Sequence, residues 1–557
     1  MSNENENKLE AKLLQIMEGQ DAEVGLLSPS KPRKSQADKL VELVTDDNCI
    51  LFRDQFDEPY ASVRVKDHWE TRKLNGKHFK RWLCGLFWKI HRKAASSTAM
   101  SSALNILESK AYFEGEKITL ETRIAPRDNT IWYDLSNEKW QAIKIDSLGW
   151  EIVDHPPIIF RPHAHQRQQV IPAKGDGDAK ALLPFVNLAK KEQGLLIMVY
   201  LIACFVPSIP HPIPILYGAQ GASKTTLARK LRSLVDPSSV EVLSLPTDEK
   251  ELVQQLSHHY FAFFDNISYM PDWVSDVLCR AVTGEGFSKR ELYSNDEDVI
   301  YNFIRCIGLN GINIAAKKPD LLDRAILLKL ERITKDKRKG EKEIWDKFEK
   351  MKPIILAGIF DVLSGAMKIR DSIRLSEVPR MVDFTIWGCA IAEALGSPQK
   401  DFLDAYYTNI GDQNDEAINE NSVATAIMSF MEVENTWEGS SSFLLEELNT
   451  IAEKEKLDAK GSGWPKSASA LSRRLNEVKT NLAEKGILLE SKKISGGKRI
   501  ITIQKQLQNI PVGTAEDVAQ LFGGELIQDS SQSNAVPVLP DQNNGGGESG
   551  GISGLIS

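Results

Sequence analysis

The stretch PIPILYGAQGASKTTLARKL, from Pro212 to Leu231, decides the fold. Pro214 to Tyr217 predict a short apolar strand, and a helical pattern begins at Lys224. Between them, the small residues of the loop GAQGAS at 218–223 let consecutive backbone N–H groups curl around phosphate oxygens, and the N-terminus of the helix adds partial positive charge. This order of strand, glycine loop and helix predicts a phosphate-binding loop rather than an ordinary glycine turn.

The residues after the loop supply the groups that a nucleoside triphosphate needs. Lys224 would neutralise the β- and γ-phosphates, and the hydroxyl of Thr225 would coordinate Mg²⁺. The usual glycine before the lysine is Ser223 in this chain, and serine fits there if its φ stays negative. We therefore expect ATP and Mg²⁺ as cofactors. The expected ATP-binding residues are Gly218, Ala219, Gln220, Gly221, Ala222, Ser223, Lys224, Thr225 and Thr226.

A second apolar strand ends in an acidic residue. Tyr260 to Phe264 are followed by Asp265, which would bind the Mg²⁺ directly or through water. An apolar run that ends in aspartate is common and indicates little by itself. Together with the phosphate loop before it, the run favours a Mg²⁺-binding carboxylate. The next residue is Asn266, where many motor ATPases have a glutamate. An asparagine can orient the attacking water but cannot accept its proton, so the general base stays open.

Two further polar residues flank short apolar strands. The stretch Cys306 to Asn310 ends in an amide that could reach the γ-phosphate or the attacking water. Arg324 stands directly before an apolar strand and could stabilise transition-state charge at a neighbouring subunit's γ-phosphate. A structural Asp–Arg pair explains Arg324 equally well. The expected catalytic residues are Lys224, Asp265, Asn266, Asn310 and Arg324, with Thr225 and Asp265 on the metal.

In this order, the segments GAQGASKTT, YFAFFDN, TGEGFSKRELYSNDED, IGLNG and PDLLDRAILLKL resemble the superfamily 3 helicase module of AAA+ ATPases. The resemblance is to the poxvirus primase-helicase type and its prokaryotic relatives in phages, plasmids and integrative elements. It covers about residues 180–335, with a looser likeness from about 70 to 505. Ser223 and Asn266 depart from the strictest consensus, and Asn266 puts the hydrolysis rate in doubt.

The resemblance implies a homo-oligomeric ring, a hexamer, in which Arg324 acts on the neighbouring subunit. It also implies a β-hairpin over about Gly286 to Tyr301 that grips DNA in a central channel, with Lys289 and Arg290 as its basic residues. The implied partners are single-stranded or forked duplex DNA and a separate primase or replication protein.

We expect an α/β protein with an AAA+ P-loop ATPase core, in which helices flank a parallel sheet. The alternation of helical and strand patterns from about 178 to 335 favours this fold class. The expected parts are a flexible segment 1–35, an α+β domain 36–165, the ATPase domain 166–335, a helical extension 336–435, a winged helix 437–505, and a disordered acidic glycine-rich tail 506–557.

The segment from Ser462 to Lys505 is strongly basic, with ten Lys/Arg against three Glu. Helical patterns are followed by two short strands around Gly496 and Gly497, which resembles a winged helix whose recognition helix spans Ser467 to Lys479. A winged helix that binds protein through a solvated basic face is the alternative. The expected DNA contacts here are Lys466, Arg473, Arg474, Lys498 and Arg499.

A second basic segment, Arg64 to Lys93, has ten Lys/Arg against Asp67 and Glu70, with aromatic residues between them. Such residues can stack on bases, but they suit the core side of an amphipathic helix at least as well. The sequence also predicts strand-like runs at KITLETRIA (117–125) and TIWYDL (130–135). His163 and His165 are expected in a solvated connector.

The formal net charge of −8 over 557 residues would argue against nucleic-acid binding if the charge were spread evenly along the chain. It is not spread evenly. The tail from Gln506 onward has six Asp/Glu and no Lys/Arg, so one segment dominates the sum. The six cysteines show no CxxC pair, and the longest apolar run, Leu195 to Val206, is too short to cross a bilayer. We expect a cytoplasmic protein that does not bind membranes.

Two functions fit these observations. The first is an ATP-dependent DNA helicase or origin-melting motor in the replication of a mobile element. The second is a nucleotide-switched DNA-binding or initiator factor in which Asn266 makes turnover very slow. A small-molecule kinase with the same loop explains neither the basic C-terminal segment nor the succession of Asn310 and Arg324.

Overall fold

The computed structural model describes residues 34–290, 298–301, 303–311, 318–334, 340–419, 421–459, 461, 464–493 and 499–506. Nearly all of them belong to the first of two units, Met1–Gln504 and Lys505–Ser557. The expected segment 1–35 lies almost wholly outside the described residues, and so does the expected tail beyond residue 506.

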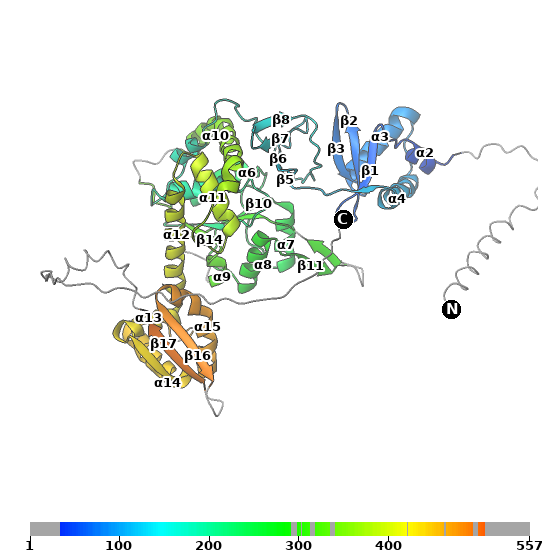
Figure 1. The fold of residues 1–557 in the computed structure, drawn as a ribbon. Helices are drawn as coiled ribbons and strands as arrows, with labels where there is room; N and C mark the ends of the chain where they lie inside the picture. The colour runs from blue at the N-terminus through cyan, green and yellow to red at the C-terminus, as the bar shows by residue number, and fades with distance from the viewer. Residues whose placement is uncertain are drawn as a thin grey trace, which may run out of the picture. The chain divides into compact units, whose positions relative to one another are not determined.

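A parallel four-stranded sheet forms the centre of the fold (Figure 1). Its strands are β9 (Ile213–Tyr217), β10 (Phe261–Phe264), β13 (Cys306–Asn310) and β14 (Ala325–Lys329), in the order β10-β13-β9-β14. Beyond β10, Leu243 makes one parallel bridge with Phe264. The strands are buried on both faces, which explains why they read in the sequence as continuous apolar runs.

Alternate residues of these strands enter two different cores. Phe261 and Phe263 of β10 pack in one core, and Ala262 and Phe264 in the other. The first core includes residues of α5 (Gln193–Ala203), α6 (Lys224–Val235), α10 (Glu341–Ile369), α11 (Val382–Ala394) and α12 (Gln399–Asn419). The second includes α7 (Glu249–His258), α8 (Asp272–Thr283) and α9 (Pro319–Leu322). The sheet therefore lies between two helical layers, as expected for the α/β class.

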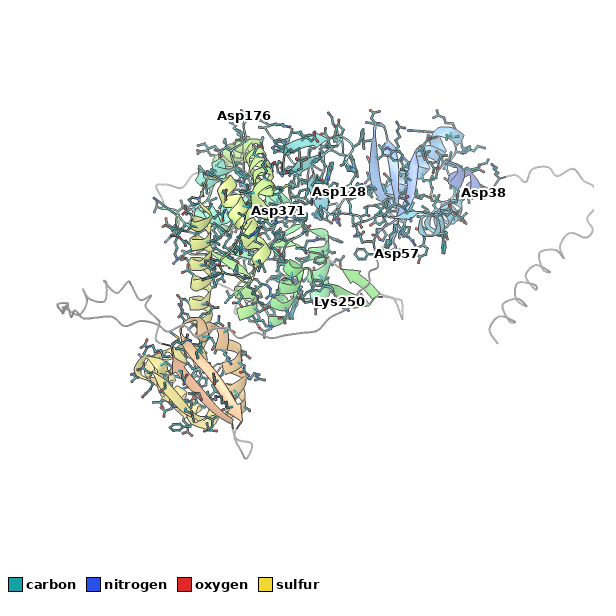
Figure 2. The ribbon with its side chains drawn as sticks, viewed as in Figure 1. Asp38, Asp57, Asp128, Asp176, Lys250 and Asp371 are labelled. Carbon is teal, nitrogen blue, oxygen red and sulfur yellow. The ribbon has the colours of Figure 1, made fainter. Side chains whose placement is uncertain are left out.

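The N-terminal elements form two sheets. The first has the order β3-β2-β1-β4 and packs on helices. On its surface, Asp57, labelled in Figure 2, pairs with Arg53 and Lys117. Its elements are α2 (Gln36–Glu42), β1 (Cys49–Arg53), β2 (Pro59–Val65), β3 (His68–Lys73), α3 (Lys77–His91), α4 (Ser97–Phe113) and β4 (Glu116–Lys117).

The second N-terminal sheet is the antiparallel meander β5 (Ile124–Arg127), β6 (Thr130–Asp134), β7 (Ala142–Asp146) and β8 (Gly149–Val153). Its Tyr133 and Trp150 belong to the same core as α5 and α10, so this sheet is built into the α/β part. The run at 130–135 is a strand as expected, but the run at 117–125 is not continuous, because residues 118–123 lie outside strands. Arg123 has φ 62°, which interrupts an extended strand.

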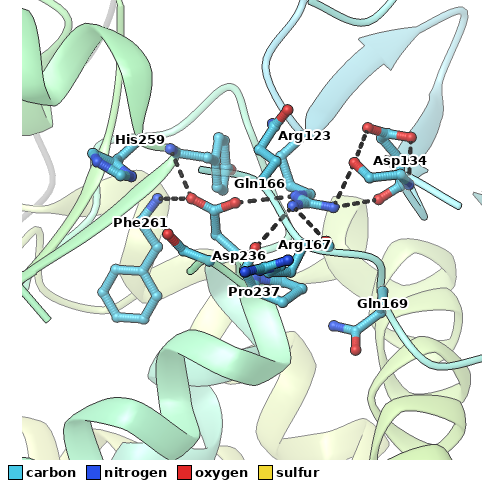
Figure 3. Close-up of polar contacts among 12 residues, drawn as sticks. Arg123, Asp134, Gln166, Arg167, Gln169, Asp236, Pro237, His259 and Phe261 are labelled. Atoms are coloured by element: carbon cyan, nitrogen blue, oxygen red, sulfur yellow. Dashed lines mark hydrogen bonds and ion pairs between the residues drawn. The ribbon is translucent and has the colours of Figure 1, made fainter. Parts of the chain in front are cut away.

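Arg123 joins the meander to the end of α6 (Figure 3). Its side chain is fully buried, and its Nε donates to Oδ1 of Asp236, the residue that follows α6, at 3.0 Å. The other carboxylate oxygen accepts from the backbone N–H groups of Tyr260 and Phe261. Burial alone would raise the pKa of Asp236, but Arg123 and Arg232 outweigh it and hold that pKa below its usual value. The Arg123 Nη atoms donate to Asp134 O, Ser136 Oγ, Arg167 O and Pro237 O.

The expectation that His163 and His165 lie in a solvated connector is wrong. The His163 ring lies 4.9 Å from that of His258, and the His165 ring 3.8 Å from that of His259. Burial lowers the pKa of His163 to about 2, of His165 to about 4 and of His259 to about 3. Among the described residues, no cluster of histidine, cysteine and acidic side chains is arranged to hold a metal ion.

Residues 422–505 contain a separate core of helices and a three-stranded antiparallel sheet with the order β15-β17-β16. The elements are α13 (Ser422–Val433), β15 (Thr436–Ser440), α14 (Ser441–Glu455), α15 (Ala468–Glu484), β16 (Ile487–Lys493) and β17 (Arg499–Lys505). A two-stranded antiparallel ribbon, β11 (Phe287–Arg290) and β12 (Asp298–Tyr301), lies between α8 and β13 in the chain. In the described part of the chain, none of the helices combines the length and apolar character needed to span a bilayer.

Candidate nucleotide and nucleic-acid sites

The loop from Gly218 to Ser223 leaves the end of β9 and leads into α6. Three of its residues have positive φ: Gly218 at 138°, Gly221 at 84° and Ser223 at 61°. Our expectation that Ser223 fits with negative φ is therefore wrong. Serine here adopts the left-handed region, which glycine occupies without a steric penalty, to turn the chain into the first residue of the helix.

Residue 218 must be glycine because another segment of the chain passes too close to it to leave room for a Cβ atom. A Cβ atom at Gly218 would lie 2.4 Å from the carbonyl oxygen of Leu330, the residue after β14. Leu330 N donates to Tyr217 O at 2.9 Å, and Ile333 N donates to Gly221 O at 3.3 Å. Residues 330–333 therefore support one side of the loop, a role that no sequence pattern indicates.

Lys224 is the first residue of α6 and turns back over the loop. Its Nζ donates to Gly218 O at 2.7 Å and to Ala219 O at 3.2 Å. Partial burial lowers the pKa of this ammonium group, and the nearby carboxylate of Asp265 opposes that effect. The ammonium group thus lies over the loop, where the phosphates of a bound nucleotide would be expected.

Thr225, Asp265 and Asn310 meet at the carboxyl-terminal edge of the sheet, although they are far apart in sequence. The hydroxyl of Thr225 donates to Asp265 Oδ1 at 3.2 Å. The Asn310 amide nitrogen donates to the same oxygen of Asp265 and lies 3.3 Å from Thr225 Oγ1. Thr225 is the second residue of α6, Asp265 follows β10, and Asn310 is the last residue of β13.

This oxygen-rich group fits Mg²⁺ beside a phosphate chain. Hydroxyl and carboxylate oxygens are the ligands that Mg²⁺ takes from proteins, with phosphates and water completing its shell. Asn310 is 3% exposed, so its amide is fixed rather than free to follow a ligand. Thr225 and Asp265 would hold the ion, and the ion would neutralise charge on the phosphates.

Asn266 follows Asp265 with φ 57° and an exposed side chain. Its backbone N–H donates to Asp265 Oδ1 at 2.9 Å. The left-handed conformation suits asparagine better than most residues. The residue thus fixes the Asp265 carboxylate through its backbone, while its side chain is left open to solvent.

Arg324 is not brought together with the loop of its own chain. It precedes β14, whose parallel pairing sets Ala325 beside Ile213 and Lys329 beside Tyr217, so Arg324 lies at the opposite edge of the sheet. Its guanidinium group forms an ion pair with Asp320, so the expected Asp–Arg pairing exists with Asp320 rather than Asp323. Arg380, which our sequence reasoning missed, pairs with the same Asp320 and with Asp323.

The structure describes the side chains of only some of the expected DNA-contacting residues. The backbones of Lys289 and Arg290 lie in β11, opposite Val299 and Asp298, but their side chains lie outside the described residues. Lys498 and the side chain of Arg499 also lie outside them. Lys466 and Arg473 are exposed at the start and on the outer side of α15, whereas Arg474 pairs with Glu477 at 2.7 Å.

Two family models match this chain. Residues 179–416 match the actinomycete integrative conjugative element replication protein, and residues 423–516 match the C-terminal domain of the same RepA family. The two models identify an integrative-element replication protein. Together they extend over more than half of the chain and leave the N-terminal sheets outside. None of the curated proteins compared with the chain matches it.

Among solved structures, the similar ones include apo forms of the NrS-1 C-terminal region. One is 13% identical, with a TM-score of 0.39, and covers 85% of this chain and 100% of that one. Another, of residues 305–718, is 14% identical with a TM-score of 0.39 and the same coverage.

Proposed function

We propose that the chain is an ATP-dependent DNA motor, a helicase or origin-melting ATPase, that acts in the replication of a mobile element. The observation that carries the proposal is the meeting of Thr225, Asp265 and Asn310 beside Lys224 at one edge of a parallel sheet. The replication context comes from the family match.

In this proposal the loop 218–223 is a P-loop that holds ATP. Its backbone N–H groups and the N-terminus of α6 bind the phosphates, and Lys224 leaves the Gly218 and Ala219 carbonyls to reach the β- and γ-phosphates. Thr225 and Asp265 hold Mg²⁺, and Asn310 orients the attacking water or the γ-phosphate. Because catalysis of phosphoryl transfer rests on positioning and charge stabilisation, a prearranged group of this kind is what the reaction requires.

The order of the strands supports an AAA+ type of core. The loop strand β9 lies between β13, which carries Asn310, and β14, which Arg324 precedes. Arg324 is at the far edge of the sheet from its own loop, so it can act on a γ-phosphate only if it belongs to a neighbouring subunit. We infer a homo-oligomeric ring, a hexamer, in which Arg324 exchanges Asp320 for the neighbour's nucleotide.

DNA would be held by the β11–β12 ribbon and by residues 437–505, which we interpret as a winged helix. The helices α14 and α15 followed by the β16–β17 hairpin have the order of that fold, and Lys466 and Arg473 are exposed at α15. The separate core of this segment agrees with a DNA-binding module attached to the motor.

The test is ATP hydrolysis by the full chain with Mg²⁺, with and without single-stranded DNA. Lys224→Ala and Asp265→Asn should each lower kcat/KM roughly a hundredfold, because each removes charge stabilisation at the phosphates. Lys180→Ala, which removes an exposed lysine away from the loop, is the matched control and should hydrolyse ATP at the wild-type rate. If Lys224→Ala keeps wild-type kcat/KM, the loop is not the nucleotide site.

One observation favours a second function, a nucleotide-switched initiator with very slow turnover. Asn266 stands where a motor needs a general base, and an amide cannot accept the proton of the attacking water. This alternative predicts tight ATP binding, ATP-dependent assembly and little phosphate release. Asn266→Glu should then raise turnover, whereas DNA-stimulated hydrolysis by the unmodified chain would rule the alternative out.

A further inference from the structure

The solvent side of α3 carries a basic face outside both family matches. Between Lys77 and Lys93 the sequence has six Lys/Arg and no Asp or Glu. All six are exposed, and among the described residues none of them makes an ion pair or a side-chain hydrogen bond. Most solvent faces mix the two signs of charge, so this helix is unusual in having no internal neutralisation. The six cations are Lys77, Lys80, Arg81, Lys89, Arg92 and Lys93.

The core side of the helix accounts for only part of its aromatic residues. Phe79, Leu83 and Phe87 are buried against the first N-terminal sheet and α4. Trp82 is partly buried beside Phe79, with ring centroids 5.4 Å apart. Trp88, by contrast, is 54% exposed. The amphipathic-core explanation therefore holds for Phe79 and Trp82 but leaves Trp88 unexplained.

Trp88 and three cations lie on one stripe of α3. Lys77, Arg81, Trp88 and Arg92 follow one another at spacings of four, seven and four residues, which places them on one face of a helix. From Lys77 to Arg92 the stripe is roughly 22 Å long at 1.5 Å per residue. The stripe ends at Arg92, the C-cap residue of the helix.

Positive charge is concentrated at the start of this stripe. The pKa of His78 is lowered, by partial burial first and then by the nearby cations Arg72, Arg81 and Lys77. Arg72 comes from β3, so a second element adds to the same charge. Its own partner Glu70 neutralises Arg72 in part, and α3 supplies the excess.

We propose that the solvent face of α3 binds single-stranded DNA, with Lys77, Arg81 and Arg92 on phosphates and Trp88 stacked on a base. Unpaired cations fit a polyanion, and an exposed aromatic ring among them fits bases that are free to stack. A duplex keeps its bases stacked inside, so it would use the cations but not Trp88. This contact goes beyond the proposed motor and needs no ATP hydrolysis.

The experiment is a titration of the full chain, without nucleotide, against a fluorescently labelled oligo-dT strand at several salt concentrations. Lys77→Gln/Arg81→Gln should lower the slope of log K against log salt by about 1.4, because each lost phosphate contact on single strands contributes about 0.7. The control Lys110→Gln/Lys250→Gln removes two exposed lysines, one from α4 and one, labelled in Figure 2, from α7. The control should leave the slope unchanged.

Trp88 tests the stacking part of the proposal. Trp88→Ala should weaken binding of the single strand about tenfold, whereas Trp88→Phe, which keeps a ring, should keep most of the affinity. Thermal melting of each variant is the control for correct folding. Unchanged affinity and slope in folded Lys77→Gln/Arg81→Gln would overturn the proposal.

Two other results would also contradict single-stranded DNA as the partner. One is a loss of affinity for a blunt duplex as large as that for the single strand in Trp88→Ala. The other is a result in which the same variants lose binding to anionic phospholipid vesicles but still bind DNA as the wild-type chain does. The loss confined to single strands is the supporting result, and it does not depend on whether the chain hydrolyses ATP.

Discussion

Ser223 occupies a backbone conformation that favours glycine. Ser223 has φ 61° and directly precedes Lys224, so the direction in which Lys224 leaves the loop depends on the backbone turn at Ser223. Glycine adopts this conformation freely, and a β-branched residue is strongly disfavoured in it. The side chain at this position therefore controls how easily the loop forms.

We predict that Ser223→Gly keeps ATP affinity at the wild-type level and that Ser223→Val lowers it roughly five- to a hundredfold, since 1–3 kcal/mol of strain would oppose the bound loop. The measurement is titration with a fluorescent ATP analogue in the presence of Mg²⁺. Equal affinities for Val and Gly at residue 223 would show that the loop does not need this conformation when nucleotide binds.

At this scale the sequence predicted which residues meet, but not how they are held. Asp265 follows β10 and Asn310 ends β13, and the carboxyl ends of parallel strands share one edge, so their proximity was expected. The pairing of Lys224 with loop carbonyls, the sign of φ at Ser223 and the role of Asp320 depend on backbone geometry. No local sequence pattern encodes these features.

At the scale of elements, the Arg123–Asp236 ion pair links the meander to α6, the helix that begins at Lys224. Asp236 follows α6 directly, and its second oxygen binds the backbone that leads into β10. The Asp236 carboxylate thus holds the end of α6, the helix that contains Thr225, and the start of β10, the strand that Asp265 follows. A buried charge left without its partner is strongly destabilising.

We predict that Arg123→Gln lowers the free energy of unfolding by about 3–5 kcal/mol, because it leaves the Asp236 carboxylate buried and unpaired. The measurement is chemical denaturation followed by circular dichroism. Arg127→Gln, at the end of β5 and on the surface, is the control and should change stability by less than about 1 kcal/mol. A similar loss in both variants would contradict the structural role of Arg123.

The sequence could predict the strands of the central sheet, because strands buried on both faces leave long apolar runs. It could not predict that the run at 117–125 would break. The interruption serves the buried guanidinium of Arg123, whose partners Asp236 and Pro237 are more than a hundred residues away. Long-range burial of a charged residue overrides local strand propensity.

At the scale of the whole molecule, buried histidines make stability depend on pH. Arg232 Nη2 lies 2.7 Å from Nδ1 of His259, so this nitrogen accepts a hydrogen bond and the ring is neutral. His259 is 6% exposed, and burial lowers its pKa to about 3. The sequence suggested a solvated connector because it could not show that His163 and His165 pack on the end of α7.

We predict that the melting temperature falls as pH falls from 7.5 to 5.5. Below about pH 6.5 these histidines are protonated in the unfolded chain but stay neutral in the folded chain, so the free energy of unfolding falls as pH falls. The loss is up to about 1.4 kcal/mol per pH unit for each strongly shifted histidine. His259→Gln should reduce this dependence, measured by scanning calorimetry. A melting temperature independent of pH over this range, or an unchanged slope in the variant, would contradict the neutral buried cluster.

The most direct test of the central claim is the separation of a forked DNA duplex by the full chain with ATP and Mg²⁺, followed together with phosphate release. We predict that the wild-type chain hydrolyses ATP, faster with DNA, and separates the strands, while Lys224→Ala does neither. Strand separation that proceeds without ATP, or a chain that releases no phosphate with or without DNA, would contradict the account.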